Sequence, residues 1–387
     1  MAKIWSDRGP RPPLQDRGKT KIPFMIFALE TSVNSKSGVS ARCRSVDSNL
    51  RGRTLNSMHA KCSDSNEKTG MARRTFLGTA LLTGGVLLAR GSDVIFGAGS
   101  SGSSNVATNP TWKLGGDLTV NRLGFGAMRV TGEGIWGWPA DRGNALKVLK
   151  RAVELGVNLI DTADAYGPET SELLIAEALY PYPNGLVIAT KGGLTRPGPG
   201  EWVPDGRPEH LKQAVDGSLK RLRLERIDLY QLHSIDPKVP MEESLGAIKE
   251  MKDAGKIRHV GLSNVEPDEI ERARKVVPIV SVQNRYNIED RKSENALVYC
   301  EKNNLGFLPW FPIGGTRGLK HENALNAAAK AHGVSVFQVA LAWLLDRSPV
   351  MLPIPGTSSV AHLEENIAAA KLKLAPEEWK AINALAS

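Results

Sequence analysis

The chain has 387 residues, a length that suits either one α/β barrel with an extension or two average domains. Its 50 Lys and Arg exceed its 41 Asp and Glu, but residues 1–110 hold 16 of the basic residues and 7 of the acidic ones, which leaves 34 of each sign in the rest. A nucleic-acid surface needs basic residues clustered on the folded part, so no nucleic-acid partner is expected. Cys300 is the single cysteine after residue 110, which excludes an internal disulfide or a cysteine-cluster metal site there.

The first 98 residues divide into two segments of different composition. Residues 1–70 are rich in Ser, Arg, Lys and Asn and lack a sustained hydrophobic period, which predicts a disordered leader. Residues 71–98 begin with Met-Ala-Arg-Arg-Thr-Phe-Leu and continue into an apolar run of about 15 residues, too short for a membrane span of ~20. This layout resembles a bacterial twin-arginine export signal. The alternative is a basic patch beside an incidental apolar run.

The position of this signal bears on the start and the location of the protein. A signal that begins 70 residues into a chain suggests that Met71 is the biological start and that residues 1–70 are a mis-assigned extension. If the signal functions, the export machinery is a partner and the protein is periplasmic or extracytoplasmic; otherwise it is cytoplasmic. No stable membrane span is expected. Residues 99–110 are predicted to be a Gly/Ser linker, and residues 111–387 the folded body.

From residue 111 onward, short β-rich runs alternate with helical ones. A hairpin is expected around Gly115-Gly116-Asp117. Strands are then expected at 123–125, 157–160, 186–190, 227–232, 260–262, 279–282, 306–310 and 351–354, and helices at 142–155, 171–179, 208–222, 241–254, 267–276, 292–302, 323–331, 335–347, 360–369 and 376–385. This alternation predicts a (β/α)8 TIM barrel with an N-terminal hairpin. An open doubly wound sheet is the alternative, but residues 124–129 lack the third glycine of a dinucleotide fingerprint.

Four polar side chains lie at the predicted carboxyl ends of successive strands, where a barrel carries its site. Asp161 follows the second strand, Tyr166 lies in the loop after it, Lys191 ends the third and His233 ends the fourth. A phenol has a pKa of about 10, which a nearby ammonium lowers. Tyr166 is therefore predicted to donate a proton, with Lys191 as the tuning cation and Asp161 fixing that lysine. His233 would orient a substrate carbonyl, and because none of these groups supplies a hydride, a nicotinamide is required.

Each of these residues also has a simpler interpretation. Asp161 suits a turn, Tyr166 a rim position, Lys191 a solvated strand end and His233 a buried imidazole. Their succession on neighbouring strand ends favours a site instead. A metal-dependent hydrolase is a further alternative, but no close metal-ligand pair lies at a strand end among the histidines of the body, which are His210, His233, His259, His321, His332 and His362. No metal site is therefore expected.

Several spaced motifs occur in one order along residues 112–385. They are Asp161-Thr-Ala-x-x-Tyr166-Gly, Thr190-Lys191, Gln231-Leu-His233, Gly261-Leu-Ser263-Asn264, Gln283-Asn-x-Tyr286-Asn and Pro355-Gly-Thr-Ser-x-x-x-His362-Leu-Glu-Glu365-Asn366. The chain resembles an aldo-keto reductase, closest to a bacterial branch that includes pyridoxal reductases. The resemblance implies NAD(P)H-dependent reduction of an aldehyde or ketone, with Asp161, Tyr166, Lys191 and His233 as the catalytic tetrad. A nucleotide-sensing regulatory or binding protein on the same scaffold is the alternative function.

The resemblance also implies the cofactor contacts. Ser263, Asn264 and Gln283 would hold the nicotinamide carboxamide, and Trp310 stands where the family usually stacks a tyrosine on the nicotinamide. The remaining candidates are Gly126, Gly356, Thr357, Ser358, His362, Glu365 and Asn366.

Two of these candidate positions differ from the family pattern. The usual Lys and Arg that grip the adenosine 2′-phosphate fall on Gly356 and His362, so two cations are missing or weakened. Backbone amides in the turn at 357–359 remain able to bind phosphate, and NADP(H) is expected over NAD(H).

Two tryptophans follow the first predicted strand in a Gly-rich loop. Trp136 and Trp138 either wall an apolar substrate pocket or pack over the mouth of the barrel.

Overall fold

The computed structural model of the chain describes residues 110–314 and 322–384. The predicted leader and export signal, and the linker up to residue 109, lie outside the described residues and stay predictions.

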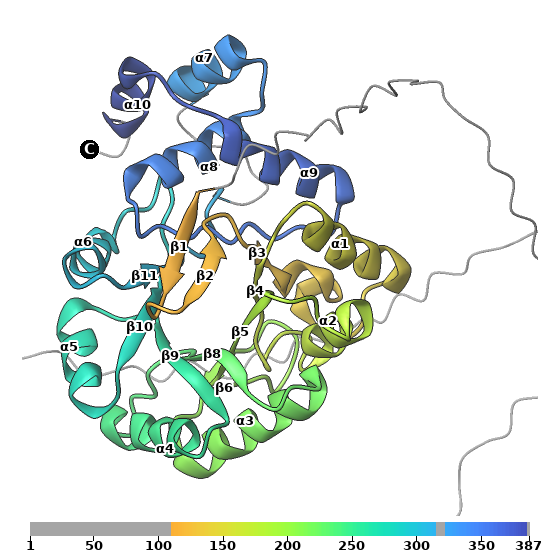
Figure 1. Cartoon of the computed structure of the whole chain (residues 1–387), viewed down its shortest axis with the longest axis vertical. Helices are drawn as coiled ribbons and strands as arrows, with labels where there is room; N and C mark the ends of the chain where they lie inside the picture. The colour runs from red at the N-terminus through yellow and green to blue at the C-terminus, as the bar shows by residue number, and fades with distance from the viewer. Residues whose placement is uncertain (1–109, 315–321, 385–387) are drawn as a thin grey trace, which may run out of the picture. The chain divides into compact units, whose positions relative to one another are not determined.

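A two-stranded hairpin opens the described part, as predicted. Strands β1 (Thr111–Leu114) and β2 (Leu118–Asn121) pair antiparallel. Gly115 and Gly116 have φ of 63° and 87°, which a side chain would disfavour, so the turn requires glycine. The buried side chains of the hairpin pack with residues that begin the barrel strands, among them Leu159, Val187, Leu229 and Leu352. The hairpin therefore covers the amino-terminal end of the barrel (Figure 1).

A curved sheet of seven parallel strands forms most of the barrel. In spatial order its neighbours run β11, β10, β9, β8, β5, β4, β3. The strands are β3 (Phe125–Gly126), β4 (Leu159–Asp161), β5 (Val187–Gly192), β8 (Ile227–Leu232), β9 (Ile257–Ser263), β10 (Ile279–Gln283) and β11 (Gly306–Phe307). Most of their residues are buried, as expected for a sheet that is covered on both faces.

The predicted eighth strand closes the barrel without forming a regular strand. Residues 350–355 join β11 through a parallel bridge between Phe307 and Met351 and a 2.8 Å hydrogen bond from Leu352 N to Phe307 O. On the other side Gly124 N donates to Pro353 O over 2.9 Å. Pro353 and Pro355 have no N–H to donate, which explains why pairing is incomplete. The closure confirms the predicted (β/α)8 barrel.

Helices surround the strands; Figure 1 shows most of them as an outer ring, with α7 and α10 lying beyond α8. They are α1 (Arg142–Glu154), α2 (Thr170–Leu179), α3 (Pro208–Leu222), α4 (Met241–Asp253), α5 (Pro267–Val276), α6 (Glu294–Asn303), α7 (Glu322–His332), α8 (Val336–Arg347), α9 (Val360–Ala368) and α10 (Pro376–Asn383). Each predicted helix has its counterpart here, with ends that agree within two residues. Capping explains the agreement at several starts: the Asp141 side chain, for example, accepts a 2.8 Å hydrogen bond from Asn144 N.

Short elements in the loops were not predicted. They are the hairpin of β6 (Leu194–Thr195) with β7 (Val203–Pro204), and the 3-10 helices η1 (Ala127–Val130), η2 (Glu133–Ile135) and η3 (Ala369–Lys371). Elements of two to four residues carry no measurable hydrophobic period, so sequence patterns cannot reveal them. All but η3 follow the carboxyl ends of β3 and β5, where the candidate site lies.

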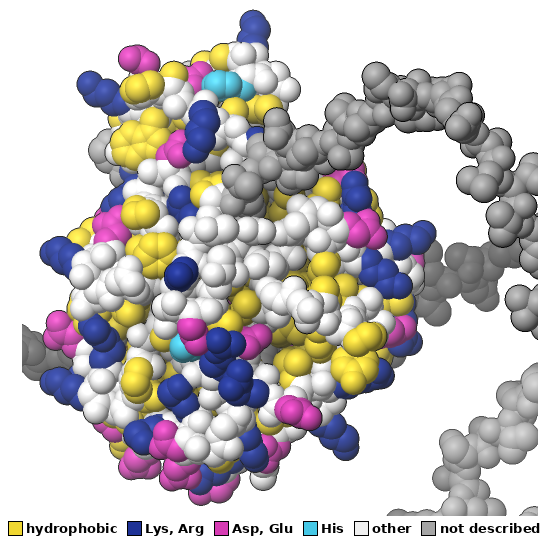
Figure 2. Space-filling model, viewed as in Figure 1, with side chains coloured by type: hydrophobic (Ala, Val, Ile, Leu, Met, Phe, Trp, Pro, Cys, Tyr) yellow, Lys and Arg dark blue, Asp and Glu magenta, His cyan; other side chains and the backbone are white. Residues whose placement is uncertain are grey.

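The surface carries charges of both signs. Figure 2 shows Lys and Arg interspersed with Asp and Glu over the face in view. Within residues 110–314 and 322–384, no single helix is long and apolar enough to cross a membrane, although the bent pair 323–332 and 336–347 meets that requirement by length and composition together.

Candidate active site

Lys191 is the centre of a buried polar cluster at the carboxyl end of β5. Its Nζ donates to Asp161 Oδ2 over 2.7 Å, to the Thr162 carbonyl over 2.8 Å and to the Tyr166 hydroxyl over 3.2 Å. The Lys191 side chain is fully buried and that of Asp161 is 3% exposed. Three hydrogen bonds use all three ammonium hydrogens, so a charge that would be costly to bury alone is fully satisfied.

Two glutamines complete the surroundings of Asp161. Its Oδ1 accepts from Gln283 Nε2 over 2.7 Å and from Gln231 Nε2 over 3.2 Å. Sequence reasoning gave Gln231 no role. The available signal was its position on β8, two residues before His233, which follows that strand; a spacing of two turns both side chains toward the same side of the sheet. The carboxylate that holds Lys191 is thus itself fixed by amides from two further strands.

The pKa values of the cluster differ in part from the expectation. Burial alone would lower the pKa of Lys191, but Asp161 and Tyr166 more than offset it, and that pKa is raised. Burial raises the pKa of Tyr166, and although Lys191 acts in the predicted downward direction, the net pKa lies above 10. The prediction of a lowered pKa was therefore wrong for the net value, because desolvation exceeds the charge effect. Tyr166 is protonated near neutrality.

His233 lies beside the Tyr166 ring at the end of β8. The two ring centroids are 5.8 Å apart and the planes meet at 82°. Burial, and then the charge of Lys191, lower the pKa of His233 well below 6.5, so its imidazole is neutral near pH 7. The structure thus brings Asp161, Tyr166, Lys191 and His233 together at one end of the barrel. Near pH 7 the Tyr166 phenol is protonated and the His233 imidazole is neutral.

The predicted carboxamide residues lie next to this cluster, but one is already engaged. Asn264 donates to the His233 carbonyl and to Ser263 Oγ, both over 3.1 Å, and accepts from Trp310 Nε1 over 3.0 Å. The Ser263 hydroxyl keeps its own hydrogen for donation. Gln283 uses its amide nitrogen on Asp161, and its Oε1 accepts no hydrogen bond from the described residues. One donor and one acceptor therefore remain, which is what a carboxamide group requires.

The missing lysine at position 356 has a structural cause. A Cβ on Gly356 would lie 2.5 Å from the Gly126 carbonyl oxygen, and a Cβ on Gly126 would lie 2.7 Å from the Ile354 carbonyl oxygen. The two backbones therefore meet too closely for side chains. The same Cβ on Gly356 would lie 3.6 Å from Arg129 Cγ. Arg129 is exposed and has no hydrogen bond or ion pair within residues 110–314 and 322–384, so a cation from η1 lies beside the gap.

The other predicted phosphate residues surround the start of α9. The Ser359 side chain caps this helix by accepting from His362 N over 3.4 Å, and Ser359 N donates to Thr357 Oγ1 over 3.0 Å. Asn144 of α1 donates to the Ser358 carbonyl over 2.6 Å. His362 is exposed in the first turn, and Glu365 and Asn366 follow in the second. This places the predicted residues at a helix N-terminus, where backbone amides favour anions.

Aromatic residues gather in the loops around Tyr166. The Trp202 ring of the β6/β7 hairpin lies 6.3 Å from both the Tyr166 and the His233 centroids. Arg196 stacks on Trp202 at 3.7 Å and lies 5.5 Å from the Trp136 centroid. Trp138 is 48% exposed and stacks with Arg142 of α1. Sequence reasoning missed Trp202 and Arg196 because the short hairpin that presents them was not predicted.

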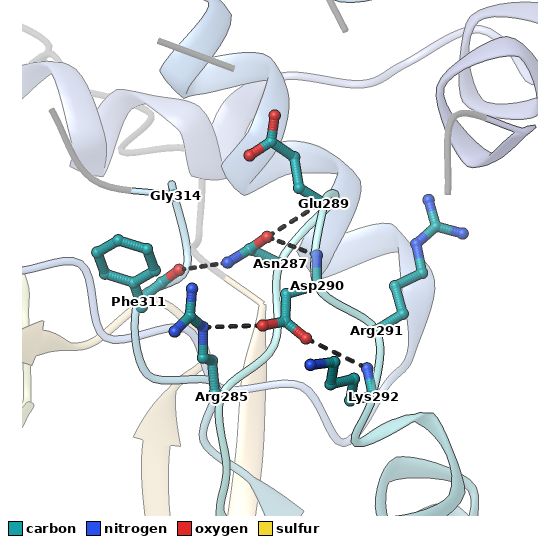
Figure 3. Close-up of a pocket in the computed structure, with 8 residues that line it drawn as sticks. All are labelled: Arg285, Asn287, Glu289, Asp290, Arg291, Lys292, Phe311 and Gly314. Atoms are coloured by element: carbon teal, nitrogen blue, oxygen red, sulfur yellow. Dashed lines mark hydrogen bonds and ion pairs between the residues drawn. The ribbon is translucent and has the colours of Figure 1, made fainter. Parts of the chain in front are cut away.

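A cavity of about 490 Å³ lies apart from the Lys191 cluster, between the loops that follow β10 and β11 (Figure 3). Arg285 and Asp290 form a 2.9 Å ion pair in its wall, and Arg285 lies 5.6 Å from the Trp310 centroid. Elsewhere, no group of three His, Cys, Asp or Glu with metal-binding geometry occurs among the residues that the structure describes.

Comparisons with known proteins agree with the fold. The model of the Aldo/keto reductase family matches residues 122–387. An uncharacterized oxidoreductase of Schizosaccharomyces pombe is 55% identical over 262 residues, which are 68% of this chain and 85% of that protein. Pyridoxine 4-dehydrogenase of Escherichia coli is 45% identical over 268 residues, 68% of this chain and 93% of that protein. A solved aldo/keto reductase of Klebsiella pneumoniae, in complex with NADP and acetate, is 26% identical, with a TM-score of 0.61 over 72% of this chain and 95% of that one.

The barrel and these matches together define an NAD(P)-dependent oxidoreductase. More narrowly, the chain belongs to the aldo/keto reductase family.

Proposed function

We propose that the protein reduces an aldehyde or ketone to an alcohol, with Tyr166 as the proton donor. The observation that carries this proposal is the buried contact of Lys191 Nζ with both Asp161, at 2.7 Å, and the Tyr166 hydroxyl, at 3.2 Å. A bound nicotinamide would supply the hydride. Tyr166, protonated near pH 7, gives its proton to the carbonyl oxygen as that oxygen gains negative charge. The adjacent Lys191 ammonium stabilises the phenolate that remains.

His233 and the carboxamide residues have positioning roles in this scheme. The neutral imidazole of His233 donates a hydrogen bond to the same carbonyl oxygen and orients it toward Tyr166. Ser263 and Gln283 Oε1 offer the remaining donor and acceptor for a carboxamide. Asn264, whose amide is used by Trp310 and His233, fixes the Trp310 indole that would stack on the nicotinamide.

We assign the cofactor preference to NADP(H), with Arg129 in the role of the absent lysine. Its side chain lies beside Gly356, and an unpaired guanidinium is well suited to a phosphate. Replacing Arg129 with Gln should raise KM for NADPH by about 10-fold or more and change KM for NADH little, because only NADPH carries the 2′-phosphate. The matched control is Lys150→Gln, an exposed cation on α1. Equal effects on both cofactors, or an NADH preference in the wild type, would overturn the assignment.

Pyridoxal is the first substrate candidate, because a relative that is 45% identical is named pyridoxine 4-dehydrogenase. The test of the function is the oxidation of NADPH by the full chain, followed by absorbance, with pyridoxal and a panel of other aromatic and aliphatic aldehydes and ketones. Turnover of at least one carbonyl supports the proposal. If none of them is reduced with either NADPH or NADH, the proposed function is wrong.

We further propose that the protein is exported by the twin-arginine route, on the basis of Arg73-Arg74 and Phe76-Leu77 ahead of an apolar run. Fractionation of the native host should recover the wild type outside the cytoplasm and a variant with Arg73 and Arg74 both changed to Lys inside it. Cytoplasmic wild type contradicts export. A tryptic peptide from residues 1–70 would contradict a start at Met71.

A further inference from the structure

Arg196 joins three loops at the carboxyl end of the barrel. Its Nε donates to the Glu201 carbonyl over 2.7 Å, within its own hairpin. One terminal nitrogen donates to the Ile135 carbonyl over 3.1 Å and to the Ala165 carbonyl over 3.0 Å. The residue is 9% exposed, so these bonds form largely away from water. A planar guanidinium, whose donors point in fixed directions, is needed to reach all three loops at once.

The loops that Arg196 joins carry the residues around the reacting carbonyl. Ala165 directly precedes Tyr166, and Ile135 directly precedes Trp136. Ile135 has φ of 60°, a conformation that β-branched residues rarely adopt. Such strain persists only where the surroundings enforce it, and the bond from Arg196 to the Ile135 carbonyl is one such constraint.

The guanidinium of Arg196 also fixes the Trp202 ring. It stacks on the indole at 3.7 Å, and the indole stands edge-to-face with both Tyr166 and His233. In the proposed mechanism, Tyr166 and His233 both bond the carbonyl oxygen. A carbonyl held by both groups therefore lies beside the Trp202 ring, whose centroid is 6.3 Å from each of theirs.

We propose that Trp202 determines the substrate specificity of the enzyme, favouring carbonyls with a planar aromatic substituent, and that Arg196 is the positioning residue that holds Trp202 and the Tyr166 loop in place. This inference rests on the proposed function and extends it to the substrate class. A planar ring gains contact area and favourable edge-to-face geometry against an indole, and a short alkyl chain gains little of either. Selection is therefore expected between aromatic and small aliphatic aldehydes.

The test compares benzaldehyde with propanal in the wild type, Trp202→Leu and Trp202→Phe. We expect Trp202→Leu to lower kcat/KM for benzaldehyde by about 10-fold or more and for propanal by less than about 3-fold, with partial recovery in Trp202→Phe. A loss of the same size for both aldehydes would contradict the proposal. Tyr180→Leu is the control, because Tyr180 is an aromatic residue that also stacks with an arginine, Arg223, but is exposed and lies outside the cluster.

The positioning role of Arg196 has a separate readout. In Arg196→Lys, which keeps the charge and loses the planar donors, amide hydrogen exchange in residues 133–137 and 164–167 should accelerate, and kcat should fall for both aldehydes. The control variant Arg223→Lys should change neither. Unchanged exchange in Arg196→Lys would overturn the positioning role.

A binding measurement separates this inference from the proposed function. Calorimetric titration of the NADP⁺-loaded protein with benzaldehyde needs no turnover. Binding that Trp202→Leu weakens about 10-fold supports the inference even if no carbonyl is reduced. Absence of benzaldehyde binding to the wild type contradicts the inference, whatever the activity toward other carbonyls.

Discussion

At the scale of single residues, the chemistry depends on how buried charges are paired. Lys191 is fully buried and Asp161 nearly so, and every ammonium hydrogen of the lysine has an acceptor. Gln231 and Gln283 hold the other carboxylate oxygen. Removal of one partner from such a pair leaves an uncompensated buried charge, which typically costs about 3–5 kcal/mol. The pair thus keeps both charges compensated and holds the Lys191 ammonium against the Tyr166 hydroxyl.

A second carboxyl, that of the half-buried Asp164, lies close to the cluster without equivalent pairing. Its Oδ1 is buried and has no hydrogen-bond partner in the described part of the chain. Burial, and then the charge of Glu172, raise the pKa of Asp164 well above its usual value. The unfolded chain ionises this group near pH 3.9, so stability is lost as pH rises above that value toward the folded pKa.

A prediction for Asp164 follows from this loss of stability with rising pH. Asp164→Asn cannot ionise, so its Tm relative to the wild type should increase as pH rises above about 4. Thermal unfolding at a series of pH values measures this difference. The control is Asp253→Asn, at an exposed aspartate, which should show no comparable trend in Tm. A difference that stays constant with pH, or that falls, would refute the interpretation.

At the scale of elements, strand ends approach each other closely where the cofactor is expected. The carboxyl end of β3 meets residues 354–356 through glycine on both sides, because carbonyl oxygens occupy the space of either Cβ. The family's usual lysine therefore does not fit at position 356. η1 follows β3 directly and presents Arg129 beside that gap. The lysine that is absent at position 356 thus has a nearby counterpart in Arg129 of η1.

Gly356→Ala tests this close approach. The new Cβ would lie 2.5 Å from the Gly126 carbonyl oxygen, so backbone must shift and the free energy of unfolding should fall by about 1–3 kcal/mol. Gly246→Ala in α4 is the matched control. No atom lies within 4 Å of its new Cβ, and a helix interior should gain about 0.5–1 kcal/mol. Urea unfolding measures both. A Gly356→Ala variant as stable as the wild type would show that the two strand ends can separate.

At the scale of the whole barrel, closure depends on a segment with two prolines and on one arginine. Arg122 donates to the carbonyls of Leu345, Ser348 and Met351, and so ties the end of α8 and the closing segment to the start of the first barrel strand. Its side-chain bonds hold the closing segment where prolines limit backbone pairing.

Arg122→Met should weaken this closure while it keeps most of the apolar stem. Three carbonyls would each lose a donor, although the Ser348 carbonyl would keep Met351 N, and the free energy of unfolding should fall by about 1–3 kcal/mol. Amide exchange at Leu352, which bonds to Phe307, should accelerate more than at Leu262 in β9, inside the sheet. Uniform exchange at both positions would mean that Arg122 stabilises the barrel as a whole and does not govern closure.

Sequence patterns predicted the barrel because its helices and longer strands have strong periods and clear caps. They also placed Asp161, Tyr166, Lys191 and His233 at strand ends, where the structure finds them within one cluster. They could not reveal the contact of Arg196 with Trp202. The hairpin that presents both residues has strands of two residues, which are too short to show a hydrophobic period. Nor could they give the net pKa of Tyr166, because that value depends on burial, which only the three-dimensional arrangement determines.

The most direct test of the proposed chemistry compares two changes from tyrosine to phenylalanine. Tyr230 is the matched control. Its buried hydroxyl has no hydrogen-bond partner within residues 110–314 and 322–384, and it packs against Gly192, the residue that follows Lys191. With an aldehyde that the wild type reduces, Tyr166→Phe should lower kcat by about 10²–10⁴-fold, whereas Tyr230→Phe should leave it within about 2-fold. Undiminished turnover by Tyr166→Phe would contradict Tyr166 as the proton donor.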